Sequence, residues 1–267
     1  MHRSLPTLFV PLLLSLSAAA APAPASVPPT ATTEDPAADK RPEIATLTAT
    51  LDEQIAKKGV ADTEAVATID KLFQEFPASG PKDRAAIVKA LSKCFEQKRD
   101  VKEGEPRNNK LFIASAAAMG QMGPDSTKEL IRWIGHKDHR KDPAVQDRLI
   151  RSLGQTKDDA AIKTLTNLLD DKDPALVNAA ATSLGEFKEK PLETRKTIFE
   201  ALLKTLMSAK GSTDSDPLNT IFKERYEIIL APIVTTLGAL SKHDERDPEE
   251  WQRWWNKNKK ANWDADN

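Results

Sequence analysis

Two histidines and two aspartates lie close together in the polar stretch between Gly135 and Asp142. His136 and His139, with Asp138 beside them, offer two imidazoles and a carboxylate, which are ligand types that transition metals accept. Two histidines three residues apart are a weak signal, and a polar connection between helices explains the same residues. We therefore expect no metal site. An unrecognised metal-dependent enzyme at His136 and His139 remains the less favoured alternative function.

Two other potentially reactive groups lack neighbouring residues that would activate them. Cys94 is the single cysteine and lies between Leu91 and Phe95 in an apolar helical pattern, so a buried side chain is expected rather than a reactive thiol. His243 and Asp244 have no serine or cysteine nucleophile with a local signature beside them. We expect no catalytic residue and no cofactor.

Three tryptophans near the C-terminus meet on one helical face. Asp247 and Pro248 form a helix start, and the helix carries Trp251, Trp254 and Trp255. Aromatic faces can stack on sugars, which makes a carbohydrate or cell-wall binding module an alternative function. We favour packing, with residues 248–260 covering the C-terminal end of the fold.

The charge balance excludes one broad class of partner. The chain of 267 residues has 39 Lys and Arg against 40 Asp and Glu, a net charge of -1. A nucleic-acid binder would carry a basic excess, so no nucleic-acid partner is expected.

The N-terminal residues have the order of a secretory signal peptide. Arg3 precedes an apolar run from Leu5 to Leu16, and small residues follow up to Ala25. This run is too short for a stable membrane anchor. Residues 1–25 predict export to the periplasm or the cell exterior, and the Pro, Ala and Thr of 26–42 predict a disordered linker.

Beyond residue 42, apolar residues recur at the three- and four-residue spacing of helices, which predicts an all-α domain over residues 43–260. A repeat can be measured within it. Asp142-Pro143-Ala144 recurs as Asp173-Pro174-Ala175, and Leu153-Gly154 recurs as Leu184-Gly185, both at an offset of 31 residues. Met119-Gly120 lies 34 residues before Leu153-Gly154. A period of this length predicts a solenoid in which each unit is a pair of helices.

The repeat resembles the HEAT repeat, in particular the short bacterial type called the PBS-lyase HEAT-like repeat. The resemblance rests on Asp173-Pro174 followed by Val177, Ala180, Ala181, Leu184 and Gly185. It covers residues 109–208 well, and 62–98 and 215–241 more weakly. It implies a right-handed α-α superhelix, here of about five helical hairpins with a C-terminal capping helix.

The resemblance also implies a function. The second helices of HEAT repeats line a concave face that usually binds another protein, so we expect a non-catalytic interaction scaffold or adaptor. Basic residues placed outward on the second helices are the candidate partner-binding residues. They are Lys128, Arg132, Lys163, Arg195, Lys196 and Lys204, with Lys89 and Lys93 on an earlier helix.

Overall fold

The computed structural model describes residues 39–99 and 107–265, which belong to one compact unit spanning Pro36–Asn267. The expected signal peptide at 1–25 and most of the linker at 26–42 lie outside the described residues. Within them, every regular element is helical, so the prediction of an all-α fold is confirmed. The α-helices are α1 (Pro42–Ile55), α2 (Asp62–Glu75), α3 (Pro81–Lys93), α4 (Lys110–Gln121), α5 (Pro124–Trp133), α6 (Pro143–Gln155), α7 (Asp159–Leu168), α8 (Pro174–Leu184), α9 (Leu192–Ser215), α10 (Thr220–Ser241) and α11 (Pro248–Asn258).

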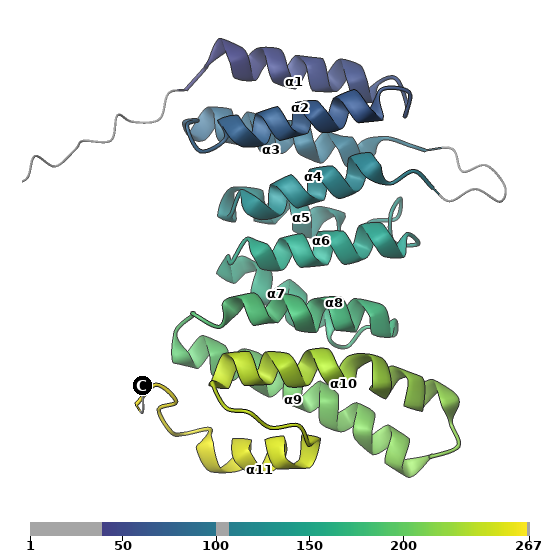
Figure 1. Cartoon of the computed structure of the whole chain (residues 1–267), viewed down its shortest axis with the longest axis vertical. Coiled ribbons are helices and arrows are strands. Elements are labelled where there is room, and N and C mark those ends of the chain that lie inside the picture. Colours follow the sequence, from purple (N-terminus) through teal and green to yellow (C-terminus); the bar gives the residue numbers. More distant parts are fainter. Residues whose placement is uncertain (1–38, 100–106, 266–267) are drawn as a thin grey trace, which may run out of the picture. The chain divides into compact units, whose positions relative to one another are not determined.

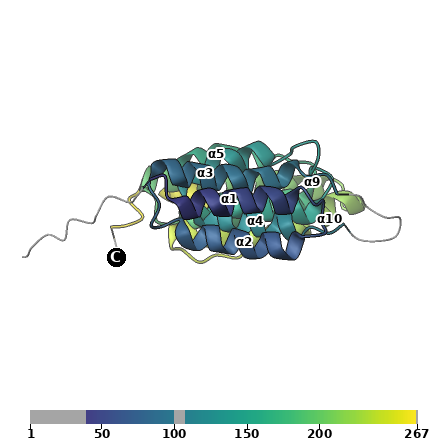
Figure 2. The same cartoon turned by 90° about the horizontal axis from the view of Figure 1, so that it is seen from above.

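The helices pack in two layers. Helices α2, α4, α6, α8 and α10 contact one another in succession and form the first-helix layer. Helices α3, α5, α7, α9 and α11 contact one another in the same way and form the second-helix layer. Figure 2 shows α3 and α5 on one side of the unit and α2 and α4 on the other. Helix pairs packed on their neighbours are the architecture that the repeat predicted.

Aspartate and proline start the repeated helices, as predicted. The carboxylate of Asp142 accepts a hydrogen bond from the backbone N–H of Val145 at 3.2 Å, and that of Asp173 accepts one from Ala175 at 2.9 Å. Each satisfies one of the free N–H groups of a helix N-terminus, and the following proline needs no hydrogen bond. The recurring Asp-Pro pair therefore fixes where α6 and α8 begin.

The repeated glycines mark the closest approach between first helices. A β-carbon at Gly154 of α6 would lie 2.7 Å from the β-carbon of Ser183 on α8, and one at Gly120 of α4 would lie 2.9 Å from that of Ser152 on α6. Real β-carbons do not approach so closely, so these positions need glycine. The Ser183 hydroxyl also donates to the carbonyl of Ile150 on α6 at 3.1 Å. The repeat spacing in the sequence located these glycines, and the serines on the facing helix explain why no larger residue fits there.

The hairpin formed by α9 and α10 is longer than the others. Helices α9 and α10 have 24 and 22 residues, against 10 to 14 for the other α-helices of the described chain. Pro232 lies inside α10, where it removes one backbone hydrogen bond. Thr236 of the same helix donates to the carbonyl of Ala181 on α8 at 2.9 Å and so continues the contact between first helices.

Single helices cover the two ends of the stack. Helix α1 contacts both α2 and α3, and in Figure 2 it lies between the two layers. At the other end α11 contacts α9, and Trp251 is fully buried there. The ring centroids of Trp251 and Trp255 lie 5.7 and 5.1 Å from that of Phe199 on α9. Terminal elements of this kind spare the outermost repeats from exposing apolar faces.

The glycine contact gives a first prediction. Gly154→Ala adds a β-carbon where Ser183 leaves no room, and overpacking of this kind costs about 1–3 kcal/mol. Helix propensity returns up to about 1 kcal/mol of that loss. We expect Gly154→Ala to lower the free energy of unfolding measured by urea denaturation.

Gly211 in the interior of α9 is the matched control, because a β-carbon there meets no atom within 4 Å. Gly211→Ala gains helix propensity without any overpacking, so it is expected to raise the free energy of unfolding by up to about 1 kcal/mol. Equal effects of the two substitutions would show that the helices do not meet closely at Gly154.

Candidate partner-binding face

A polar groove runs between α3 and α5 on the second-helix layer. It has a volume of about 450 Å³, and its lining includes the cations Lys89, Lys93, Lys128 and Arg132 and the carboxylates of Glu96, Asp125 and Glu129. Lys128 and Arg132 come from α5 and were predicted as partner-binding residues. Lys89 and Lys93 of α3, which were also candidates, lie in the same groove as Lys128 and Arg132.

The cations of this groove differ in how they are paired. Lys93 forms an ion pair with Asp52 at 2.5 Å, and Arg132 lies 3.5 Å from Glu96 and 3.2 Å from Glu129. Lys89 and Lys128 are exposed and form no ion pair within residues 39–99 and 107–265. Those two ammonium groups are the ones available to an acidic group of a partner.

Other predicted cations lie farther along the same layer. Lys163 on α7 and Lys204 on α9 are exposed. Lys204 lines two further grooves, one between α9 and the start of α10, near the end of α7, and one between α9 and α11. Grooves therefore follow the second helices from α3 to α11.

The prediction that Arg195 faces outward is wrong. Its side chain is 3% exposed and donates to the carbonyls of Lys190 and Leu240 at 3.0 and 2.8 Å. It also pairs with Asp264, and this hydrogen bond holds the pKa of the Asp264 carboxyl below its usual range. Arg195 therefore ties α9 to the end of α10 and to the C-terminal segment.

Lys196 is also largely covered. Its side chain is 12% exposed, pairs with Glu193 at 3.3 Å and lies over the ring of Trp263. The C-terminal segment that covers Lys196 and Arg195 has no repeat pattern, so no local spacing indicates that it folds back onto α9. Helical spacing alone had placed both residues outside.

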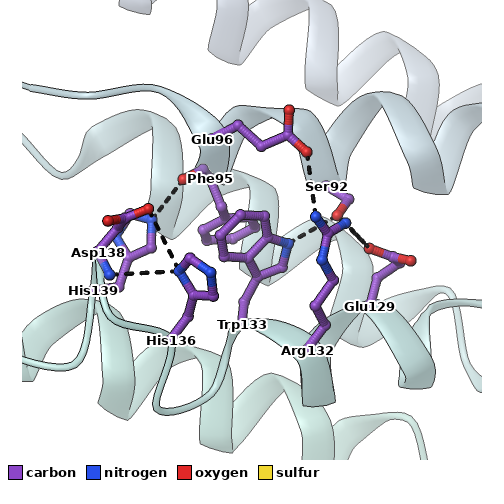
Figure 3. A network of polar contacts seen from close by, with 9 residues as sticks. All are labelled: Ser92, Phe95, Glu96, Glu129, Arg132, Trp133, His136, Asp138 and His139. Carbon is purple, nitrogen blue, oxygen red and sulfur yellow. Dashed lines mark hydrogen bonds and ion pairs between the residues drawn. The ribbon is translucent and has the colours of Figure 1, made fainter.

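A hydrogen-bond network links α3 and α5 and runs from the buried Trp133 out to the groove (Figure 3). The indole N–H of Trp133 donates to the Ser92 hydroxyl at 2.8 Å, and that hydroxyl donates to Glu129 at 2.5 Å. Glu129 in turn accepts from Arg132, whose guanidinium also lies over the Trp133 ring. The network fixes Arg132 between α3 and α5. Ser92 and Glu129 were missed in the sequence because no local spacing links residues on different helices.

The two histidines of the 135–142 connection have different surroundings. His139 is fully buried, and its Nε2 lies 2.7 Å from the carbonyl oxygen of Phe95, which can only accept, so Nε2 carries the proton. His136 contacts Asp138 at 3.6 Å. No group of three or more metal-binding side chains occurs in the described part of the chain. The His139 ring packs on Phe95, Phe112 and Trp133, with centroids 5.7, 4.8 and 5.7 Å away.

The other two candidate groups are covered as well. Cys94 is buried, and burial raises the pKa of its thiol to about 12, which keeps it protonated and unreactive. Trp251 and Trp255 are 0% and 8% exposed, while Trp254 is half-buried and stacks on His243 with centroids 5.0 Å apart. A sugar platform needs free indole faces, and two of these three are turned inward.

Comparison with known proteins agrees with the architecture. A family model described as HEAT repeats matches residues 138–207, which contain α6, α7, α8 and most of α9. This match indicates HEAT repeats over those residues and falls on the two units whose 31-residue offset the sequence showed. Neither the curated proteins nor the solved structures compared with the chain gave a match. No helix within the described residues is long and apolar enough to cross a membrane.

The burial of His139 gives a prediction for pH dependence. Desolvation lowers the pKa of His139, and the nearby Arg107 acts in the same direction. The unfolded chain, with a histidine pKa of about 6.5, therefore takes up the proton more readily than the folded chain. We expect stability to fall as the pH drops below about 6.5, by up to about 1.4 kcal/mol per pH unit.

Urea denaturation between pH 7.5 and 5.0 measures this effect. His139→Gln removes the titrating group and should flatten that part of the pH dependence. Phe112→Leu is the control, because Phe112 packs on the same imidazole with centroids 4.8 Å apart and its loss leaves the titration in place. An unchanged pH slope in His139→Gln would contradict the assignment.

Proposed function

We propose that this protein is a non-catalytic interaction scaffold that binds an acidic surface of another protein along its second-helix layer. HEAT repeats commonly serve as protein-interaction scaffolds, and the chain has such repeats over residues 138–207. The observation that carries the proposal is the groove between α3 and α5, in which Lys89 and Lys128 have no ion-pair partner among the described residues.

The arrangement of charge supports this choice of face. Lys128 on α5, Lys163 on α7 and Lys204 on α9 are exposed on consecutive second helices. Lysines at the rim of an interface keep most of their solvation, and complementary charge raises the association rate. The floor of the groove is firm, because the Trp133 to Ser92 hydrogen bond is buried. A rigid scaffold loses little entropy when a partner binds.

We further propose that the repeats are of the short bacterial PBS-lyase HEAT-like type and that the protein is exported. The 31-residue offset supports the first point, and the charged, apolar and small-residue order of residues 1–25 supports the second. The periplasm or the cell exterior would then be where the partner is found.

Charge reversal tests the binding face. The protein is tagged after Asn267, expressed in its source organism and recovered with its partners. We expect Lys128→Glu/Lys163→Glu to reduce recovery of a specific partner protein by about tenfold or more, because each lysine becomes a repelling carboxylate. Quantitative mass spectrometry of the recovered proteins gives the measurement.

The control variant carries the same change in charge elsewhere. Lys71 on α2 and Lys172 before α8 are exposed and line none of the grooves on the second-helix layer. Lys71→Glu/Lys172→Glu should recover the partner as the native protein does. Equal recovery by both variants, or recovery of no protein partner, would refute the proposed face.

Export has its own measurement. If residues 1–25 are a signal peptide, the tagged protein found outside the cytoplasm begins at Ser26 when analysed by intact mass. A protein that keeps Met1 and stays in the cytoplasm would contradict export while leaving the binding face untouched.

A further inference from the structure

The turn between α9 and α10 carries an exposed apolar surface. Leu218 is 91% exposed, Ile221 74% and Phe222 37%. We call these three residues the apolar tip. The tip is held in shape, because the side chain of Asn219 accepts hydrogen bonds from the N–H groups of Ile221 and Phe222 at 3.1 and 3.2 Å. Contiguous exposed apolar residues of this kind mark interaction surfaces.

A second apolar surface lies on the first-helix layer between α2 and α4. It is a groove of about 680 Å³, and we call it the α2/α4 groove. Val66, Ile113, Ala114 and Ala117 form most of its wall, and Ile113 is 38% exposed. Four of the five large apolar side chains exposed in the described chain therefore belong to the tip or to this groove.

Each surface carries an exposed charge that forms no ion pair within the described residues. At the tip, Asp214 pairs with Lys210, whereas Asp216 is exposed and has no such partner. In the α2/α4 groove, Arg107 pairs with Asp142 at 3.5 Å, whereas Lys110 is exposed and has no such partner. A tip inserted in the groove would bring Asp216 to Lys110.

The positions of the two surfaces exclude contact within one molecule and favour contact between two. Helices α6 and α8 separate α4 from α10 in the first-helix layer. The start of α4 and the turn between α9 and α10 lie on the same side of the stack (Figure 1). A two-fold axis repeats every contact, so two antiparallel copies can each place a tip in the groove of the other.

We propose that a second copy of this chain docks here, with the apolar tip of each copy in the α2/α4 groove of the other, as a closed two-fold dimer. The contact uses neither Lys128 nor Lys163, so the part of the second-helix layer formed by α3, α5 and α7 stays open. Such a dimer would present two partner-binding faces, and binding to a multivalent partner would gain from both.

Sedimentation velocity of the purified full-length protein over a range of concentrations tests the dimer. The native protein should show a reversible equilibrium between monomer and dimer. Ile221→Asp in the tip and Ile113→Asp in the groove should each raise the dimer dissociation constant by about tenfold or more, since each change affects both contacts. Val60→Asp is the matched control, because Val60 is 87% exposed and belongs to neither surface.

Cysteine cross-linking tests which surfaces meet. The natural Cys94 is fully buried, so a disulfide between two copies would come from the engineered cysteines. A mixture of the Ile221→Cys variant and the Ile113→Cys variant should form a disulfide-linked dimer on mild oxidation, and neither variant alone should do so.

Several outcomes would overturn the proposal. A protein that stays monomeric at all concentrations has no such contact. Dissociation by Ile221→Asp alone, or cross-linking of the Ile221→Cys variant with itself, would mean that the tips meet each other. Assemblies larger than two would mean an open chain of copies. Circular dichroism of each variant shows whether it has kept its helical fold.

Discussion

The close approach between successive first helices is the constraint on which the structure depends. At Gly120 and Gly154 the next helix presents Ser152 and Ser183, and neither glycine has room for a β-carbon. Because a larger side chain at either position would push the helices apart, each contact fixes one helix pair against the next. Gly185 faces the next first helix more loosely, since a β-carbon there would lie 3.4 Å from the nearest side-chain atom. The tight contacts thus belong to the middle of the stack.

The second-helix layer differs because it has no such contact. Its helices α5 and α7 have 10 residues each and meet their neighbours less extensively than the first helices do. Grooves remain between them, and side chains such as Lys128 stand at their rims. The buried hydrogen bond between Trp133 and Ser92 keeps α3 and α5 joined beneath one such groove. The first layer is thus held by close contacts at glycines, while the second layer leaves Lys128 exposed beside a groove.

The sequence predicted the parts of the fold that depend on local pattern. Apolar spacing gave the helices, and the recurrence of Asp142-Pro143 at Asp173-Pro174 gave the period and the helix starts. What it could not give are contacts between segments far apart in the chain. The burial of Arg195 depends on Asp264, 69 residues away, and helical spacing treats such an arginine as an outward cation. The same limit applies to the candidate site. Helical spacing predicted that Lys128 is exposed on a second helix, but it could not predict that Ser92 on another helix supports the same groove.

Hydrogen exchange of the full-length protein, followed by mass spectrometry, tests the central claim that the first-helix layer is the rigid part of the structure. Backbone amides exchange slowly where helices are held by extensive tertiary contact. The account predicts slowest exchange in α4, α6 and α8 and faster exchange in α5 and α7. Equal protection of the two layers, or slower exchange in α5 and α7, would contradict it.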